Sequence, residues 1–268
     1  MLTDGFQWDR VQDLDMVLVL AELFGFAILA FFLSMFLTPF LTDFLFKNKI
    51  GKNIRDEAWD NTGSPLFSKM HEHKKGTPTM AGILFWGVTA FLTIFNWSRE
   101  ETLLPVFFLV TSGLLGAVDD IANIRGIGKI KGLGAKLKLF LQTLIAGFGA
   151  WWFTFKLDWT SFHVPGGGIL GLASDIEVGL WYIPIFMLIV IFIMNSVDIT
   201  DGLDGLLAGS IIPSFAALAA IAFAQGDYSL TTFLTTLIGS LIAFLWFNIH
   251  PARFFMGGTG AFALGAVL

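Results

Sequence analysis

Cysteine is absent from this 268-residue chain, and charged side chains are scarce. Without cysteine the chain has no disulfide, no thiol nucleophile and no thiolate metal site. Asp, Glu, Lys and Arg make up only 14% of the residues, which argues against an ordinary soluble domain. The four histidines are too scattered for a zinc site, and no Walker-type, Gly-x-Ser-x-Gly or His-Glu-x-x-His pattern occurs.

Apolar residues are abundant instead. They make up 55% of the chain, with 30 Phe and 9 Trp, and several apolar runs approach the length of a membrane span. Helices are expected because a helix satisfies its own backbone hydrogen bonds in lipid. We therefore predict an all-α, polytopic integral membrane bundle with about seven full spans. The predicted spans are Met16–Phe46, Thr79–Trp97, Leu103–Val118, Leu137–Phe155, Leu180–Met194, Leu206–Ala224 and Leu230–Phe247.

An eighth apolar run begins near Thr259 and reaches Leu268, and its ten residues are too few to cross a bilayer. We therefore expect the chain to be part of a longer protein. No internal repeat or low-complexity segment interrupts residues 1–268, so one membrane-embedded domain is expected. The acidic N-terminal segment lacks a small-residue cleavage site, so no cleavable signal is expected.

Basic residues predict the orientation of the bundle. Most Lys and Arg residues lie in the connections 47–77, 119–138 and 248–257. The positive-inside rule makes these connections cytoplasmic, and the alternation of spans puts segment 195–205 on the same face. The outer connection 156–179 is rich in glycine, which is typical of a small hairpin or an irregular loop.

The first cytoplasmic motif surrounds Pro78. Pro78 suits the first turn of a helix, which Thr77 would cap, and Lys74 and Lys75 lie beside it in the sequence. Basic side chains near exposed helix amides would contact an anion or a uracil carbonyl. A basic loop that flanks the membrane is the simpler alternative for this motif.

The second motif is the pair Asp119-Asp120 at the end of the third span. Mg²⁺ binds one or two carboxylates, keeps several waters and bridges substrate phosphates. Neighbouring like charges also make one of the two carboxylates the better proton acceptor. The alternative is a helix end that runs into solvent.

The third motif places Asp198, Asp201 and Asp204 at a spacing of three, directly after the fifth span. If this segment is helical, the three acids share one face. One Asp at the centre of a membrane helix costs roughly 2.5–3.5 kcal/mol, so cations or polar substrates are expected to compensate the group. Two Asp-Gly turns in a connecting loop are the alternative.

The fourth motif runs from Asn248 to Gly260 and precedes the eighth apolar run. Phe255 could stack on a nucleotide base, and the glycine-rich turn that follows could offer N–H groups to a phosphate. Glycine before a spanning helix is common, so this motif is weak by itself.

In this order, the four motifs resemble those of the polyprenyl-phosphate N-acetylhexosamine-1-phosphate transferases. Residues Lys74–Met80 match Lys-x-Gly-Thr-Pro-Thr-Met, and Thr200–Gly205 match Thr-Asp-Gly-Leu-Asp-Gly. Between them lie the paired aspartates and the basic Lys131-Gly132-Leu133 loop, and Phe255-Met256-Gly257 matches the last signature. The likeness covers the chain from about residue 20 onward. The two longer signatures favour the peptidoglycan branch of this family.

The resemblance implies transfer of phospho-MurNAc-pentapeptide from UDP-MurNAc-pentapeptide to undecaprenyl phosphate, with Mg²⁺ as cofactor and lipid I and UMP as products. It implies about ten spans in the bacterial inner membrane and an active site that faces the cytoplasm. The expected partners are both substrates and the bilayer, with no nucleic acid and with a homodimer left open. The implied site residues are Asp119, Asp120 and Asp204 for catalysis, Asp198 and Asp201 for the metal, and Lys75, Thr77, Lys131, Lys136, Asn195, Gly202, Leu203, Asn248 and Phe255 for the substrates.

Two positions depart from the family pattern. Gly258 stands where the family has an aspartate that binds Mg²⁺, and Asp198 stands where it usually has asparagine. A catalytically impaired homologue is therefore one alternative, and a transferase of GlcNAc-1-phosphate from UDP-GlcNAc is another. A secondary transporter is a third, and it predicts acids near the middle of the spans rather than at their ends.

Overall fold

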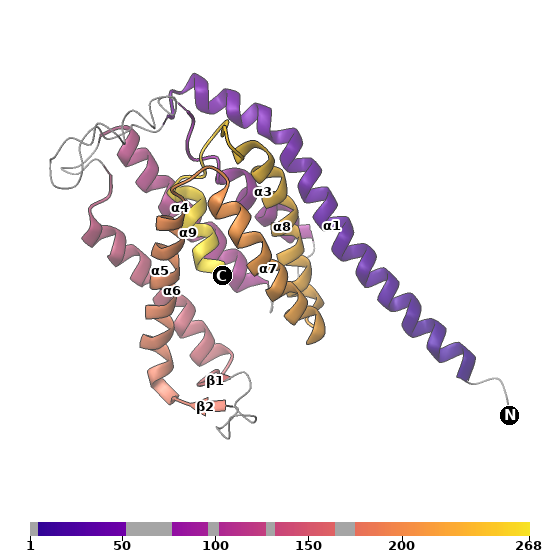
Figure 1. The fold of residues 1–268 in the computed structure, drawn as a ribbon. Coiled ribbons are helices and arrows are strands. Elements are labelled where there is room, and N and C mark those ends of the chain that lie inside the picture. Colours follow the sequence, from indigo (N-terminus) through magenta and orange to yellow (C-terminus); the bar gives the residue numbers. More distant parts are fainter. Residues whose placement is uncertain (1–4, 52–76, 96–101, 127–131, 164–174) are drawn as a thin grey trace.

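The computed structural model describes residues 5–51, 77–95, 102–126, 132–163 and 175–268, which form a helical bundle with one short hairpin (Figure 1). The elements are α1 (Gly5–Lys47), α3 (Ile83–Phe95), α4 (Leu103–Ile124), α5 (Ala135–Lys156), β1 (Ser161–His163), β2 (Asp175–Glu177), the 3₁₀ turn η2 (Gly179–Trp181), α6 (Tyr182–Thr200), α7 (Leu206–Ala224), α8 (Tyr228–Asn248) and α9 (Gly258–Val267). The predicted all-α membrane fold is confirmed.

Five of the described helices are long and apolar enough to cross a membrane, namely α1, α4, α6, α7 and α8. The apolar helices α3 and α9 are shorter. Each of the seven predicted spans coincides with a helix. The third and fifth spans were predicted too short, because α4 continues to Ile124 and α6 to Thr200. The predicted spans end where the apolar residues end, because only those residues need to face lipid. The helices themselves continue into the polar residues that follow, because their backbone hydrogen bonds continue there.

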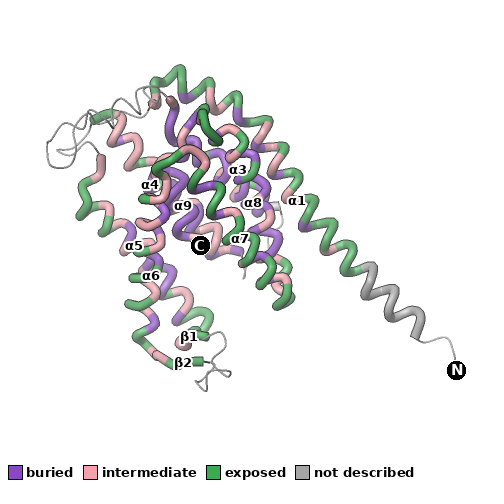
Figure 2. Tube along the Cα trace, in the orientation of Figure 1, coloured by how far each residue is buried: buried purple, intermediate pink, exposed green. Residues whose placement is uncertain are grey.

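Helix α8 packs against α1, α3 and α7, and α1 lies at the edge of the bundle (Figure 2). In the most apolar window of α8, 61% of the residues are buried inside the protein, against 11% for α1. Helix α9 is buried from Thr259 to Ala266. A helix that is apolar on every side is surrounded either by protein or by lipid, and α9 is surrounded by protein. The surrounding helices therefore fix the start of α9. The fourth motif, which includes this start, is fixed with it.

Glycines allow the closest helix contacts. A Cβ atom on Gly239 of α8 would overlap the Ala27 carbonyl of α1, and one on Gly116 of α4 would overlap the Gly258 carbonyl of α9. Membrane helices associate through such small residues because lipid provides no hydrophobic drive between them. The contact at Gly116 brings the second motif against the fourth.

The connection 156–179 contains a pair of short strands, in agreement with the hairpin that was one of its two expected structures. Strands β1 and β2 pair antiparallel, with Ser161 opposite Glu177. His163 Nδ1 and Asp175 Oδ1 lie 2.9 Å apart across the pair. The hairpin joins the ends of α5 and α6 that lie far from the acidic motifs (Figure 1).

The prediction that Pro78 begins a helix is wrong. Helix α3 begins at Ile83, and Pro78 instead forms an isolated β-bridge with Gly51. The Pro78 carbonyl accepts the Phe255 N–H at 2.8 Å, and the Phe255 carbonyl accepts the Ala81 N–H at 3.1 Å. These partners come from distant segments, so the local proline signal could not reveal them. Thr77 therefore caps no helix, and the first motif lies against the fourth.

Candidate active site

An acid-lined cavity of about 200 Å³ lies where the ends of α4 and α6 meet the start of α9. It is lined by Thr79, Asp119, Asp120, Asn123, Ile124, Asp198, Asp201, Gly257 and Gly258. All four motifs contribute to this lining. Four carboxylates from two helices thus surround one small space, and a polar, multiply charged ligand is the chemistry that such a space favours.

Asp120 contacts α9 with both carboxylate oxygens. Its Oδ1 accepts the Gly258 N–H at 3.2 Å, and its Oδ2 accepts the Thr259 N–H at 3.0 Å and the Thr259 hydroxyl at 2.7 Å. The first N–H groups of a helix have no partner within the helix, so an acid from another helix caps α9.

Asp119 contacts α5 instead. Its Oδ1 accepts the Leu133 N–H at 2.9 Å, and its Oδ2 lies 2.7 Å from Lys138 Nζ. Lys138 also lies over the Phe262 ring, 5.0 Å from its centre. The two adjacent acids therefore fix α4 to two different helices.

Asp198 and Asp201 line the cavity from the end of α6. The Asp201 N–H donates to the Asp198 carbonyl at 3.3 Å, and Asp201 ends the helix. The C-terminal end of a helix carries a partial negative charge, and α4 ends beside the same cavity. The two helix ends, Asp198 and Asp201 therefore place negative charge on this side of the cavity, opposite the start of α9.

Asp204 does not line this cavity, so the prediction that the three acids share one face is wrong. Its Oδ2 lies 2.9 Å from His250 Nδ1 and accepts the Ala252 N–H at 3.3 Å. The Asp204 side chain is 6% exposed, whereas that of His250 is 71% exposed. The helix ends at Thr200, and the turn through residue 205 carries Asp204 away.

Asn248 fixes this turn. Its side-chain oxygen accepts the Gly205 N–H at 3.0 Å, and its side-chain nitrogen donates to the Phe254 carbonyl at 2.9 Å. Gly205 has a φ of +74°, a left-handed conformation that glycine adopts without strain. Asn248 is buried, so part of its contribution to the site is structural.

The other predicted site residues that the structure describes do not line the cavity. Asn195 donates to Gln142 Oε1 at 3.0 Å within the bundle. Lys136, Gly202 and Leu203 are exposed, while Thr77 and Phe255 are half-buried. Lys75 and Lys131 lie outside the described residues.

Four N–H groups at the start of α9 already have partners within the protein. The N–H groups of Gly258 and Thr259 donate to Asp120, and those of Gly260 and Ala261 donate to the Gly257 carbonyl. An acid from another helix thus occupies the place that an anionic ligand would take.

Comparison with known proteins identifies the family. The model of glycosyl transferase family 4 matches residues 102–268, which is more than half of the chain. The chain belongs to this family. Phospho-N-acetylmuramoyl-pentapeptide-transferase of Chloroflexus aggregans is 34% identical over 263 residues, 96% of this chain and 67% of the relative. The enzyme of the same name from Geobacillus sp. WCH70 is 34% identical over 95% of this chain and 74% of the relative. The one from Clostridium perfringens is 36% identical over 84% of this chain and 66% of the relative.

In this family 4 chain, the described residues contain no group of three or more His, Asp or Glu side chains that could hold a metal ion by themselves. Mg²⁺ does not need one, because it usually takes one or two carboxylates together with waters and substrate phosphates. Asp198 and Asp201 lie on the cavity wall, and two carboxylates fit the protein part of that donor set. Gly258 supplies no ligand, although a Cβ there would have its nearest contact at 3.5 Å, with Asp120 Oδ1.

Sequence reasoning missed two residues that contact the predicted acids in this transferase. Lys138 pairs with Asp119, and His250 pairs with Asp204. For Lys138 a signal existed, because the short connection from α4 to α5 places the start of α5 beside the end of α4. No sequence signal pointed to His250, because Asp204 lies in a turn, and side-chain positions in a turn do not follow the regular spacing of a helix or strand.

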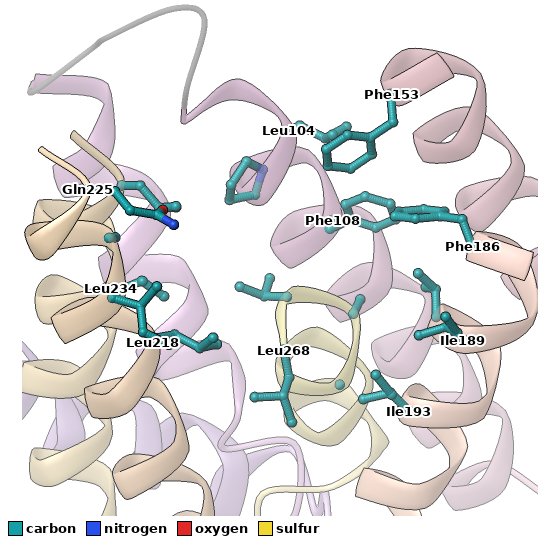
Figure 3. Close-up of a pocket in the computed structure, with 18 residues that line it drawn as sticks. Leu104, Phe108, Phe153, Phe186, Ile189, Ile193, Leu218, Gln225, Leu234 and Leu268 are labelled. Carbon is teal, nitrogen blue, oxygen red and sulfur yellow. The ribbon is translucent and has the colours of Figure 1, made fainter. Parts of the chain in front are cut away.

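A second cavity, of about 430 Å³, has an almost entirely apolar lining (Figure 3) and shares no lining residue with the acid-lined cavity. Phe108, Phe153 and Phe186 gather on one side of it, and Leu218 and Leu234 lie on the other (Figure 3). Gln225 is the one polar side chain in the lining, and the lining has no charged side chain that could pair with a phosphate or a cation. The acid-lined cavity is therefore the candidate active site.

Proposed function

We propose that this protein transfers phospho-MurNAc-pentapeptide from UDP-MurNAc-pentapeptide to undecaprenyl phosphate, giving lipid I and UMP. The reaction takes place at the acid-lined cavity. The observation that carries this proposal is the convergence of Asp119, Asp198 and Asp201, from two helices, on one small cavity. The printed names of the relatives support the choice of substrates.

Asp119 is the proposed general base. It lines the cavity at the end of a membrane-length helix, where the phosphate of a lipid acceptor would meet a water-soluble donor. Its carboxylate takes the proton from the acceptor phosphate. The freed phosphate oxygen attacks the phosphorus that carries the sugar, a new P–O bond forms, and the pyrophosphate bond to UMP breaks. Positioned bases of this kind contribute about 10²–10⁴-fold to a rate.

Asp198 and Asp201 are the proposed ligands of Mg²⁺. Bound there, Mg²⁺ would supply positive charge to the donor pyrophosphate and to the leaving UMP. The negative ends of α4 and α6 add to the attraction for a cation. In this chain Asp198 would provide the carboxylate that Gly258 cannot provide.

The nucleotide is proposed to bind beside the cavity, on the surface formed by the 201–205 turn and the Phe255 segment. Asn248 and Asp204 hold these two segments together through the Gly205 and Ala252 N–H groups. Gly202, Leu203 and the Phe255 ring would contact the uridine, with Lys75 and Thr77 nearby in sequence. Lys131 and Lys136 would steer the phosphates. The bias of basic residues supports a cytoplasmic position for this surface in a bacterial inner membrane.

The test is an assay of the purified chain with undecaprenyl phosphate and each UDP-sugar, with and without Mg²⁺. We expect UMP release and a lipid-linked MurNAc-pentapeptide that depend on Mg²⁺. A lipid product formed only from UDP-GlcNAc would replace this proposal with the GlcNAc-1-phosphate alternative. Tight binding of UDP-MurNAc-pentapeptide without UMP release would favour a non-catalytic homologue, which is the alternative that Gly258 supports.

A further inference from the structure

We propose that Asp120 is a positioning residue, which anchors the start of α9 on α4 and so fixes the Gly257–Gly258 wall of the cavity. Proton transfer is then left to its neighbour Asp119. This inference rests on the proposed function, because it divides two roles within the same site.

The hydrogen bonds of Asp120 already occupy most of its capacity to accept protons. A carboxylate has about four lone-pair positions, and Asp120 uses three of them for the two amides and the hydroxyl at the start of α9. A substrate proton would have to compete with these three donors. A helix start also attracts negative charge, so the position suits a carboxylate side chain.

Packing around the cap shows that little movement is tolerated. A Cβ on Gly116 would overlap the Gly258 carbonyl, and one on Gly257 would overlap Asp120 Oδ2. Gly257 also has a φ of +74°. Helices α4 and α9 therefore meet backbone to backbone, and the cap sets their register. Because Gly257 and Gly258 line the cavity, a shift of α9 changes the shape of the site.

Asp119 differs in the element that it contacts. Its partners, the Leu133 N–H and Lys138, belong to the start of α5 and the residues just before it. Loss of the Asp119 carboxylate therefore leaves the contact between α4 and α9 in place. The two neighbouring acids can be separated by mutation, because each holds a different element.

Thr259 provides the decisive test, because its hydroxyl bonds Asp120 and takes no part in the proposed chemistry. We expect Asp120→Asn and Thr259→Val each to raise the KM for UDP-MurNAc-pentapeptide by up to about tenfold, the usual size of a lost cap, while kcat changes little. The double variant is expected to resemble the stronger single variant, since both substitutions remove the same hydrogen bond between the Thr259 hydroxyl and Asp120. Thr259→Ser, which keeps the hydroxyl, restores the KM.

Asp119→Asn is the contrasting variant and Thr143→Val the matched control. Asp119→Asn is expected to lower kcat by about 10²–10⁴-fold and to combine multiplicatively with Thr259→Val. The Thr143 hydroxyl bonds only the Leu139 carbonyl of its own exposed helix face, so its loss is expected to leave KM unchanged. A fall in kcat for Asp120→Asn as large as for Asp119→Asn, with a silent Thr259→Val, would overturn the inference.

Thermal unfolding keeps this test separate from the transferase proposal. Asp120→Asn and Thr259→Val are each expected to lower the Tm by about 2–4 °C, and the double variant by less than the sum. If the Tm shifts are coupled in this way but the protein releases no UMP, the anchoring role of Asp120 stands and the proposed transferase reaction is wrong. Additive shifts in Tm would contradict the anchoring role of Asp120, whatever the transferase activity.

Discussion

The Asp119 carboxylate and the Lys138 ammonium lie 2.7 Å apart and join the last turns of α4 to the first turn of α5. Both side chains are largely buried, so water screens the pair less than it screens a surface ion pair. The Leu133 N–H supports the same carboxylate from the residues that precede α5. The proposed base is thus held in one orientation by a neighbouring helix.

Removal of Lys138 leaves that carboxylate without its cation. We expect Lys138→Met to lower the free energy of unfolding by roughly 1.5–3 kcal/mol, the usual range for a hydrogen bond to a charged group. Lys136→Met is the matched control two residues earlier, where the side chain is exposed, and its effect is expected to stay within about 0.5 kcal/mol. Chemical denaturation of both variants in detergent measures the difference. Equal effects would show that the ion pair contributes no specific stability.

Asp198 is expected to carry the Mg²⁺ dependence of the reaction. Asp198→Asn removes one of the two proposed ligands, so the Mg²⁺ concentration for half-maximal UMP release is expected to rise about tenfold or more. Gly258→Asp in the same background restores a carboxylate on the cavity wall, where a Cβ fits without close contact. We expect that second change to lower the required Mg²⁺ concentration again. An unchanged Mg²⁺ titration in Asp198→Asn would eliminate Asp198 as a ligand.

His250 is expected to influence nucleotide binding through Asp204. The Asp204 side chain is almost fully buried, and His250 Nδ1 lies within hydrogen-bond distance of it. His250→Leu removes that donor, so we expect the KM for the UDP-linked donor to rise by about three- to tenfold while kcat changes less. His250→Asn, whose amide nitrogen can take the place of Nδ1, is expected to retain most of the affinity. If both variants behave alike, the contact has no part in binding.

The adjacent glycines Gly257 and Gly258 are expected to respond differently to alanine. Gly257 combines a positive φ with a direct overlap between an added Cβ and the Asp120 carboxylate. Gly257→Ala is therefore expected to destabilise the protein by roughly 1–3 kcal/mol. Gly258→Ala makes only ordinary contacts and is expected to remain near the wild-type stability. Thermal unfolding of the two variants, side by side, decides this, and similar Tm values would contradict the described cap geometry.

Much of the fold could be predicted because the information was local. Apolar runs of membrane length correspond to helices, and α7 runs from Leu206 to Ala224 as predicted. The four motifs also identified the segments that line the cavity. What failed were details that depend on distant partners. Pro78 lies in a bridge rather than in a helix because Gly51 and Phe255 supply its neighbours.

The sequence by itself therefore determined the membrane class, the approximate helices, the family and the chain segments that line the acid-lined cavity. Hydrophobicity and short motifs are local properties, and each can be read within a few residues. Only the tertiary structure decided that Asp120 faces α9, that Asp119 faces Lys138 and that Asp204 faces His250. These pairings follow from how helices end, turn and pack, and a carboxylate takes whichever donor that packing brings within reach.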